Sequence, residues 1–471
     1  MPSITAGVVT ALLLAVAATT APATPTTPAT TAPASPVPAV RLPLPGAVVP
    51  AVPAVVLPAL PAGAPVPSAA GVASALAGPL GRGALGRSVS AEVLDVASGT
   101  SLFSRQPERA AVPASATKIL TAAAALSALG PNTTLPTRAV AGAAGEVVLV
   151  GGGDVLLAPQ AGHPDAVQGH AGLADLAEAT AAALRARGAT SVTLRLDDTL
   201  FSGPSVNPAW SPGDVGGGFV APIQPIEMTV GATDPAVSPR PGLPVARLAD
   251  PAMAAARRFA ALLVARGISV SGGVTRGVAP VGATVLGEVR SAPLAEIVEH
   301  DLTDSDNTTA EVLARLVALA ADRPATFAGG GAAVLTRIAT LGIPVAGARL
   351  SGGSGLGGRT AVPARTIVST LALAASAAHP ELRAVVTGLP VAGASGTLGD
   401  RFTGSALAGG AGMVRAKTGT LTGVGSLAGL VVDADGRLLA FAVVADAVPA
   451  TDPGRVALDA AATALATCGC R

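Results

Sequence analysis

The sequence is poor in aromatic residues and in lysine. Its 471 residues include one Trp, seven Phe and no Tyr, which excludes every mechanism that needs a phenol. Of the 30 basic residues, 28 are Arg and two are Lys, Lys118 and Lys417. The net charge of +1 provides no basic surface, so we expect no nucleic-acid partner. Because nearly all basic residues are arginine, the presence of lysine at these two positions calls for an explanation.

Long apolar segments are also missing, although the mean hydropathy is +0.59. No uncharged run of about 18 apolar residues is free of Pro or a polar break, so none has the length of a transmembrane helix. Residues 7–18 form a shorter apolar stretch, and small residues such as Ala15-Val16-Ala17 follow its start, which is typical of a secretory signal. We expect residues 1–23 to be a signal peptide or a membrane anchor, and the protein to be exported and cell-wall or membrane associated, or secreted.

Prolines recur every few residues between positions 21 and 67, which prevents a helix or a sheet from propagating. We predict that residues 24–68 are a disordered or polyproline-like spacer. The two cysteines, Cys468 and Cys470, close the chain and are too few for a metal site of their own. Because a disulfide across one residue is geometrically awkward, we expect free thiols.

Residues that start or stop helices outline much of the remaining chain. One predicted helix ends at Gly130-Pro131, and it carries no charge beyond Lys118, so we expect it to be buried nearly all round. Short runs rich in Val, Leu and Ala are cut by Thr422-Gly423 and Asp435-Gly436, which predicts consecutive antiparallel strands. The predicted elements are helices over residues 113–129, 250–267, 307–321, 363–378 and 452–466, a hairpin over 89–104 and strands over 412–444. This order indicates an α+β fold.

Both lysines lie in short motifs with a chemical use. Ser115 precedes Lys118 by three residues, so the two share a face at the start of a predicted helix. Ser305-Asp306-Asn307 stands just before another helix, and Lys417 opens Lys-Thr-Gly on a predicted strand. Ser-x-x-Lys, Ser-Asp-Asn and Lys-Thr-Gly, in this order, are the signature of penicillin-binding proteins and class A β-lactamases.

Each residue type in these motifs suits acyl transfer. A serine hydroxyl needs an adjacent base, which makes Ser115 the candidate nucleophile. Lys118 can be that base if burial and a second cation, Lys417, lower its pKa, whereas an arginine would not deprotonate. Ser305 can relay a proton to the leaving amine, and the amide of Asn307 can bind a peptide carbonyl.

Substrate binding is expected along the strand that begins with Lys417. The hydroxyls of Thr418 and Thr420 can bind a carboxylate. Gly419 lets a substrate backbone approach the strand edge closely. The backbone N–H groups of Ser115 and Thr420 would form the oxyanion hole.

Over about residues 86–466, the chain resembles the D-alanyl-D-alanine carboxypeptidases of the penicillin-binding-protein 4 type. Besides the three motifs, the resemblance rests on Gly151-Gly152-Gly153-Asp154, Asp198 to Pro204, Phe219 to Ile223, Gly353-Ser354-Gly355-Leu356, and Gly396-Thr397-Leu398 before Arg401-Phe402. It implies a β-lactamase/transpeptidase-like α/β/α sandwich with an antiparallel sheet. It also implies a catalytic domain split into residues 69–140 and 291–471 by an inserted accessory region, 141–290. The family usually has Asp where this chain has Gly352, and often Asp where it has Ser395.

The resemblance implies a serine carboxypeptidase that forms an acyl-enzyme on Ser115 with peptidoglycan stem peptides, releases D-alanine and is acylated by β-lactam antibiotics. Attack on a cross-link instead would make it a D,D-endopeptidase. No cofactor and no metal is expected. Asp154 and Arg359 are predicted to recognise a zwitterionic diamino-acid side chain, which needs one acidic and one basic contact. The alternative is that Asp154 caps a Gly-rich turn.

Three other functions fit the sequence less well. A class A β-lactamase would need a Glu-x-x-Leu-Asn segment and a class C enzyme a Tyr, and the sequence has neither. A non-catalytic wall-binding or β-lactam-sensing protein would be expected to have broken motifs. A metalloenzyme could use His163, Asp165 and His170, but solvated loop histidines explain this cluster better.

Overall fold

The computed structural model describes residues 63–471, apart from 82, 235 and 238–239. The predicted signal or anchor and the predicted spacer up to residue 62 lie outside the described residues. The end of the predicted spacer, residues 63–68, is described. Ala64 is buried there, and its carbonyl accepts a hydrogen bond of 3.1 Å from Arg437 Nη1.

An antiparallel sheet forms the centre of the region that contains the Lys118 and Lys417 motifs. Its five strands lie in the order β13-β14-β15-β1-β2, so β13 is an edge strand. Turns at Thr422-Gly423 and around Asp435-Gly436 join β13 to β14 and β14 to β15, as the sequence predicts. The strands are β13 (Val414–Leu421), β14 (Val424–Val432), β15 (Leu438–Ala445), β1 (Val89–Asp95) and β2 (Ser101–Arg105).

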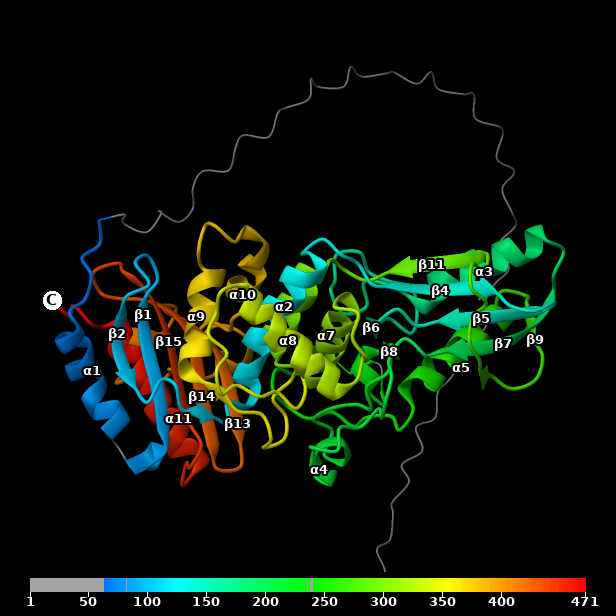
Figure 1. Cartoon of the computed structure of the whole chain (residues 1–471). Helices are drawn as coiled ribbons and strands as arrows, with labels where there is room; N and C mark the ends of the chain where they lie inside the picture. The colour runs from blue at the N-terminus through cyan, green and yellow to red at the C-terminus, as the bar shows by residue number, and fades with distance from the viewer. Residues whose placement is uncertain (1–62, 82, 235, 238–239) are drawn as a thin grey trace, which may run out of the picture. The chain divides into compact units, whose positions relative to one another are not determined.

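Helices cover both faces of this sheet (Figure 1). On one face, α1 and α11 pack against inward-facing residues such as Phe441. On the other face, α2 is buried over most of its length among its neighbours, because it has no charge beyond Lys118. The helices are α1 (Ala69–Gly81) and α11 (Thr451–Ala466) on the first face, and α2 (Lys118–Leu129), α6 (Leu294–Asp304), α7 (Asn307–Ala320), α8 (Phe327–Thr340), α9 (Ala364–Ala374) and α10 (Arg383–Thr387) on the second. This is the predicted α/β/α arrangement.

The residues between α2 and α6 build a second sheet with a core of its own. Its main path is β10-β7-β5-β4-β11, and β9 pairs with β7. Since β4 pairs with β11, the chain leaves and re-enters this region at neighbouring strands. The boundaries at 141 and 290 stay a prediction. The elements are β4 (Pro136–Ala141), β5 (Glu146–Val150), β6 (Asp154–Leu157), α3 (Leu173–Ala186), β7 (Ser191–Asp197), α4 (Pro212–Gly216), β8 (Ile226–Met228), α5 (Pro251–Val264), β9 (Ser269–Val270), β10 (Thr275–Arg276) and β11 (Val285–Arg290).

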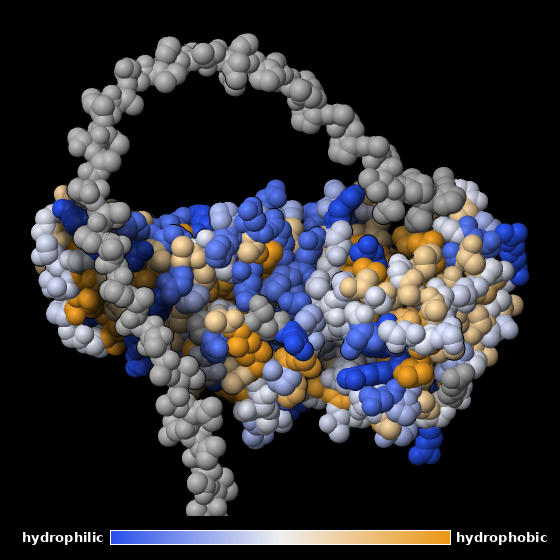
Figure 2. Space-filling view, turned by 180° about the vertical axis from the view of Figure 1, so that it is seen from behind, coloured by the Kyte–Doolittle hydropathy of each residue, from blue (hydrophilic) through white to orange (hydrophobic). Residues whose placement is uncertain are grey.

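In the described residues, buried Ala, Val and Leu side chains form three cores and contribute to the high mean hydropathy of the chain. On the face drawn in Figure 2, apolar residues form small groups between hydrophilic ones. Within the part of the chain that the structure describes, no helix has both the length and the apolar character that crossing a membrane requires.

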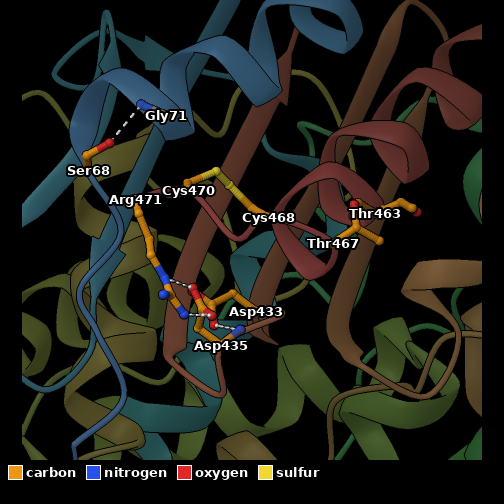
Figure 3. Close-up of a disulfide and its surroundings, with 9 residues drawn as sticks. All are labelled: Ser68, Gly71, Asp433, Asp435, Thr463, Thr467, Cys468, Cys470 and Arg471. Carbon is orange, nitrogen blue, oxygen red and sulfur yellow. Dashed lines mark hydrogen bonds and ion pairs between the residues drawn. A yellow bond between two sulfur atoms is a disulfide. The ribbon is translucent and has the colours of Figure 1, made fainter.

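The C-terminus corrects the expectation of free thiols. Cys468 and Cys470 form a disulfide with their Cα atoms 5.0 Å apart, a separation that disulfides use (Figure 3). The chain bends after α11 and returns over the start of α1, where Ser68 N donates to Cys470 O at 2.6 Å. The prediction was wrong because this bend, which tertiary contacts fix, brings the two side chains together.

Candidate active site

Ser115 lies in a 3₁₀ turn, Ala114–Thr117, that leads directly into α2. The turn is held between two glycines. A Cβ on Gly419 of β13 would clash with Pro113 O and stand 3.1 Å from Ser115 N, and a Cβ on Gly355 would clash with Ala114 O. The absence of side chains there lets β13 and the 353–356 loop contact the turn directly. Because Gly419 has no side chain, the serine turn can pack directly against β13. The sequence predicts that this glycine makes room for a substrate backbone.

The amine of Lys118 is fully buried and points at the serine. Its Nζ lies 3.1 Å from Ser115 Oγ, 2.6 Å from Asn307 Oδ1 and 3.1 Å from Ser354 O. The last two oxygens can only accept hydrogen bonds. A neutral amine satisfies both with its two N–H groups and keeps its lone pair for the hydroxyl of Ser115. This is the arrangement that a general base for the serine requires.

The electrostatics of the site favour loss of a proton from the lysines. Burial lowers the pKa of Lys118, against the opposing charges of Asp301, Asp306 and Glu311. Burial and then the charge of Lys118 hold the pKa of Lys417 well below its usual range. Two ammonium groups in one buried site repel each other, so each favours the neutral form of the other.

The Ser-Asp-Asn turn joins α6 to α7 and directs three side chains. Ser305 ends α6 in the left-handed region, with φ 60° and ψ 38°, a conformation that is rare outside glycine. Asp306 caps α7 by accepting a hydrogen bond of 2.7 Å from Thr309 N. Asn307 Nδ2 donates to Phe219 O at 3.0 Å, which turns Oδ1 of the same amide towards Lys118.

Two adjoining hollows meet at Ser115. One, of about 560 Å³, is lined by Ser115, Ser305, Asn307 and Thr420. The other, of about 690 Å³, shares Ser115, Ser305 and Thr420 with the first and adds Thr418. The structure thus brings together the predicted nucleophile, the predicted proton relay and the predicted carboxylate-binding hydroxyls. Lys118 and Lys417 lie beneath this surface, fully buried.

The second hollow also contains two residues to which the sequence analysis gave no role. Thr397 Oγ1 lies 2.8 Å from Thr418 Oγ1, so the two hydroxyls form a pair. Arg401 lines the same hollow and donates to both carboxylate oxygens of Asp459, at 3.1 and 2.5 Å. The Gly-Thr-Leu motif and the following Arg-Phe pair are the signals that point to them.

The inserted region contributes a buried arginine to the site. Arg247 donates to Val230 O at 2.6 Å and to Gly218 O at 3.2 Å, and it forms an ion pair of 3.6 Å with Asp306. Because Asp306 caps α7, Arg247 ties the Ser-Asp-Asn turn to the inserted region. No sequence pattern distinguishes this arginine from the many others, so sequence reasoning missed it.

Asp154 and Arg359 are not brought together with these residues. Asp154 is buried on β6 and accepts a hydrogen bond of 2.9 Å from Leu156 N, and burial raises its pKa to about 7. Arg359 is exposed. Neither lines the two hollows described above. The hydrogen bond of Asp154 runs forward to Leu156 within β6 and not to the preceding glycines. The cap on a Gly-rich turn and the role of Asp154 and Arg359 in recognising a diamino-acid side chain both stay predictions.

Side chains suited to metal binding are dispersed in the described residues, where no group of three His, Cys, Asp or Glu could hold an ion. The ring of His170 makes a hydrogen bond of 3.1 Å with Ala166 O of its own loop.

Known proteins share both the sequence and the fold. A model of the D-Ala-D-Ala carboxypeptidase 3 (S13) family matches residues 72–247 and 244–466. A carboxypeptidase of Mycobacterium tuberculosis is 41% identical over 413 residues, which cover 86% of this chain and 86% of that protein. A D-alanyl-D-alanine carboxypeptidase of an Actinomadura species is 31% identical, covering 75% of this chain and 76% of that protein. The crystal structure of penicillin-binding protein 4 from Haemophilus influenzae has a TM-score of 0.64 at 23% identity, covering 83% of this chain and 97% of that chain.

Proposed function

Because the chain belongs to the D-Ala-D-Ala carboxypeptidase 3 (S13) family, we propose that Ser115 and Lys118 carry its serine carboxypeptidase activity on peptidoglycan stem peptides. The observation that carries this assignment is the surroundings of Lys118 Nζ. Two of its three polar neighbours can only accept, and the third is the hydroxyl of Ser115. A neutral amine in that position has its lone pair directed at the proton that it must remove.

Acylation follows from this geometry. Ser115 Oγ attacks the carbonyl between the two terminal D-alanines while its proton passes to Lys118 Nζ. The developing oxyanion is stabilised by the backbone N–H groups of Ser115 and Thr420, which require no reorganisation during the reaction. The D-alanine leaves with a proton relayed through Ser305, and water then hydrolyses the ester on Ser115.

The carboxylate of the terminal D-alanine binds in the second hollow. Thr418 and Thr420 offer hydroxyls, and Thr397 adds a third that already contacts Thr418. Arg401 lines the same hollow as a permanent cation that also pairs with Asp459, and Lys417 lies buried beneath the hydroxyls. A free carboxylate in this place explains a preference for the end of a peptide over an internal bond.

Three finer features belong to the same proposal. A β-lactam presents an amide and a carboxylate in a similar relation and acylates Ser115 without fast release. Residues 1–23 export the protein or anchor it in the membrane, so that the folded part acts outside the cytoplasm. A D,D-endopeptidase activity on cross-links uses the same serine.

Labelling with a fluorescent penicillin tests the assignment of the serine. The purified protein is incubated with the probe, and mass spectrometry of its peptides locates the adduct. We expect one adduct on Ser115 and none in Ser115→Ala. A label that persists in Ser115→Ala contradicts the proposal. Mass analysis of intact peptidoglycan fragments then separates loss of D-alanine from cleavage of cross-links.

A further inference from the structure

Glu311 is a buried carboxylate on α7 for which the reaction described above has no role. It lies four residues after Asn307, on the same side of the helix. Its Oε2 accepts a hydrogen bond of 2.8 Å from Gly353 N. Its Oε1 accepts from Ser354 N at 3.0 Å and from Ser354 Oγ at 2.5 Å. One carboxylate thus satisfies three donors of a two-residue segment.

The segment that Glu311 holds is the one that contacts the base. Ser354 O lies 3.1 Å from Lys118 Nζ, and Gly353 O accepts a hydrogen bond of 2.7 Å from Thr121 Oγ1, one turn further along α2. The segment therefore bridges α7 and α2. The position of the segment therefore fixes the position of Ser354 O, one of the two hydrogen-bond acceptors of the Lys118 amine.

The residue before this segment shows how closely the carboxylate fits. A Cβ on Gly352 would come within 2.6 Å of Glu311 Oε1. A side chain at position 352 would therefore displace Glu311 or the loop. This gives a physical reason why the chain has glycine at the position where the resembled family usually has Asp.

We propose that Glu311 is a positioning residue for acylation: it fixes the Ser354 carbonyl, and this carbonyl together with Asn307 orients the amine of Lys118 towards Ser115. The inference rests on the proposed role of Lys118 as the base. Glu311 acts through two neighbours and touches neither the substrate nor the serine. Its effect is to keep the lone pair of the amine aligned with the hydroxyl.

The charge of Glu311 gives the proposal a second, separable consequence. The carboxylates that act on Lys118 are Asp301 of α6, and Asp306 and Glu311 of the α7 segment. Lys417 of β13 faces the same amine, and the charge of Lys118 lowers the pKa of Lys417. The three carboxylates raise the pKa of Lys118 and so oppose its deprotonation. Without the charge of Glu311, the amine of Lys118 deprotonates at lower pH. The acid limb of the pH–rate profile, where the acylation rate falls because Lys118 becomes protonated, therefore moves to lower pH.

The test compares acylation of the full chain by a fluorescent penicillin in wild type, Glu311→Gln and Glu311→Asp between about pH 5 and 9. We expect Glu311→Gln to lower the plateau rate about ten- to hundredfold through misalignment, and to shift the acid limb to lower pH. Glu311→Asp keeps the charge, so its acid limb should stay at the wild-type pH. Thr370→Val, which removes a buried hydroxyl within α9, is the control and should change neither quantity.

The outcomes separate this inference from the proposed function. If Glu311→Gln has the wild-type plateau rate and the wild-type pH dependence, the positioning role is overturned. A lower plateau rate with an unchanged pH dependence also overturns it, because a merely structural role predicts that result. If Glu311→Gln does not fold, Ser354→Ala removes one of the three hydrogen bonds and should lower the plateau about two- to tenfold with an unchanged limb; an unchanged plateau overturns the proposal. Failure of the proposed function shows itself differently, as a label that survives Ser115→Ala.

Discussion

Lys118→Arg is the substitution that tests the proposed chemistry most directly. It keeps the number of basic residues and replaces an amine that can become neutral with a permanent cation. An arginine cannot lose its proton in a protein, so it cannot accept one from Ser115. In the wild type, burial lowers the pKa of Lys118, which makes the neutral amine accessible. The substitution therefore removes the base and puts a permanent positive charge in its place.

The size of the effect follows from the role of the group. A positioned general base contributes about 10²- to 10⁴-fold to a rate, so we expect acylation of Ser115 to fall by at least about a hundredfold. The larger guanidinium must also fit where the lysine is fully buried, which costs about 1–3 kcal/mol of unfolding free energy. The loss of rate should far exceed what partial unfolding explains.

The assay is the rate of covalent labelling by a fluorescent penicillin, read on the intact protein by mass spectrometry. Lys118→Met is the matched control, because it has a similar length and neither charge nor lone pair on nitrogen. Circular dichroism at the assay temperature shows whether each variant is folded. A folded Lys118→Arg that is labelled at the wild-type rate refutes Lys118 as the base.

Two further substitutions test the packing and the electrostatics around the site. Gly419→Ala places a Cβ against the Ser115 turn, so it should lower the unfolding free energy by about 1–3 kcal/mol and slow labelling, whereas Gly425→Ala on β14, whose Cβ would stand 3.4 Å from its nearest neighbour, should do neither. Burial raises the pKa of Asp154 from 3.8 to about 7, so the folded state binds the proton more tightly and stability falls as pH rises from about 4 to 7. Asp154→Asn cannot ionise. We therefore expect the difference in unfolding free energy between this variant and wild type, measured with urea, to shift in favour of the variant by about 2–4 kcal/mol between pH 4 and pH 8. An equal difference at both pH values contradicts the burial of an ionisable carboxyl, and a loss of stem-peptide binding in this variant would support the recognition role of Asp154.

Much of the fold was accessible from local patterns. The strands of the main sheet alternate with turn residues such as Gly423, and α2 is framed by proline and glycine, so both were predicted with nearly the right bounds. The resemblance to the carboxypeptidase family and the sandwich fold are confirmed by the family match and by the fold of the Haemophilus protein. These signals are local because turns, caps and periodicity depend on neighbours in the sequence.

What could not be predicted depends on contacts between distant segments. Arg247 and Phe219 come from the inserted region, yet they hold Asp306 and Asn307 in place. Their contacts use backbone carbonyls and one ion pair, which leave no motif. The Cys468–Cys470 disulfide likewise depends on the path of the chain over α1 and not on the spacing of two residues.

The two lysines are explained by comparison with an arginine of equal burial. Arg315 on α7 is 1% exposed and lies among backbone carbonyls, with its guanidinium 4.2 Å from the ring centroid of Phe327. Burial lowers its pKa only to about 10, so it remains charged at neutral pH. Burial also lowers the pKa of Lys118 and of Lys417, from a lower starting value, and the charge of Lys118 adds to the effect on Lys417. Arginine thus suits a buried permanent charge in this fold, whereas a group that must release and take up a proton, the role proposed for Lys118, requires lysine.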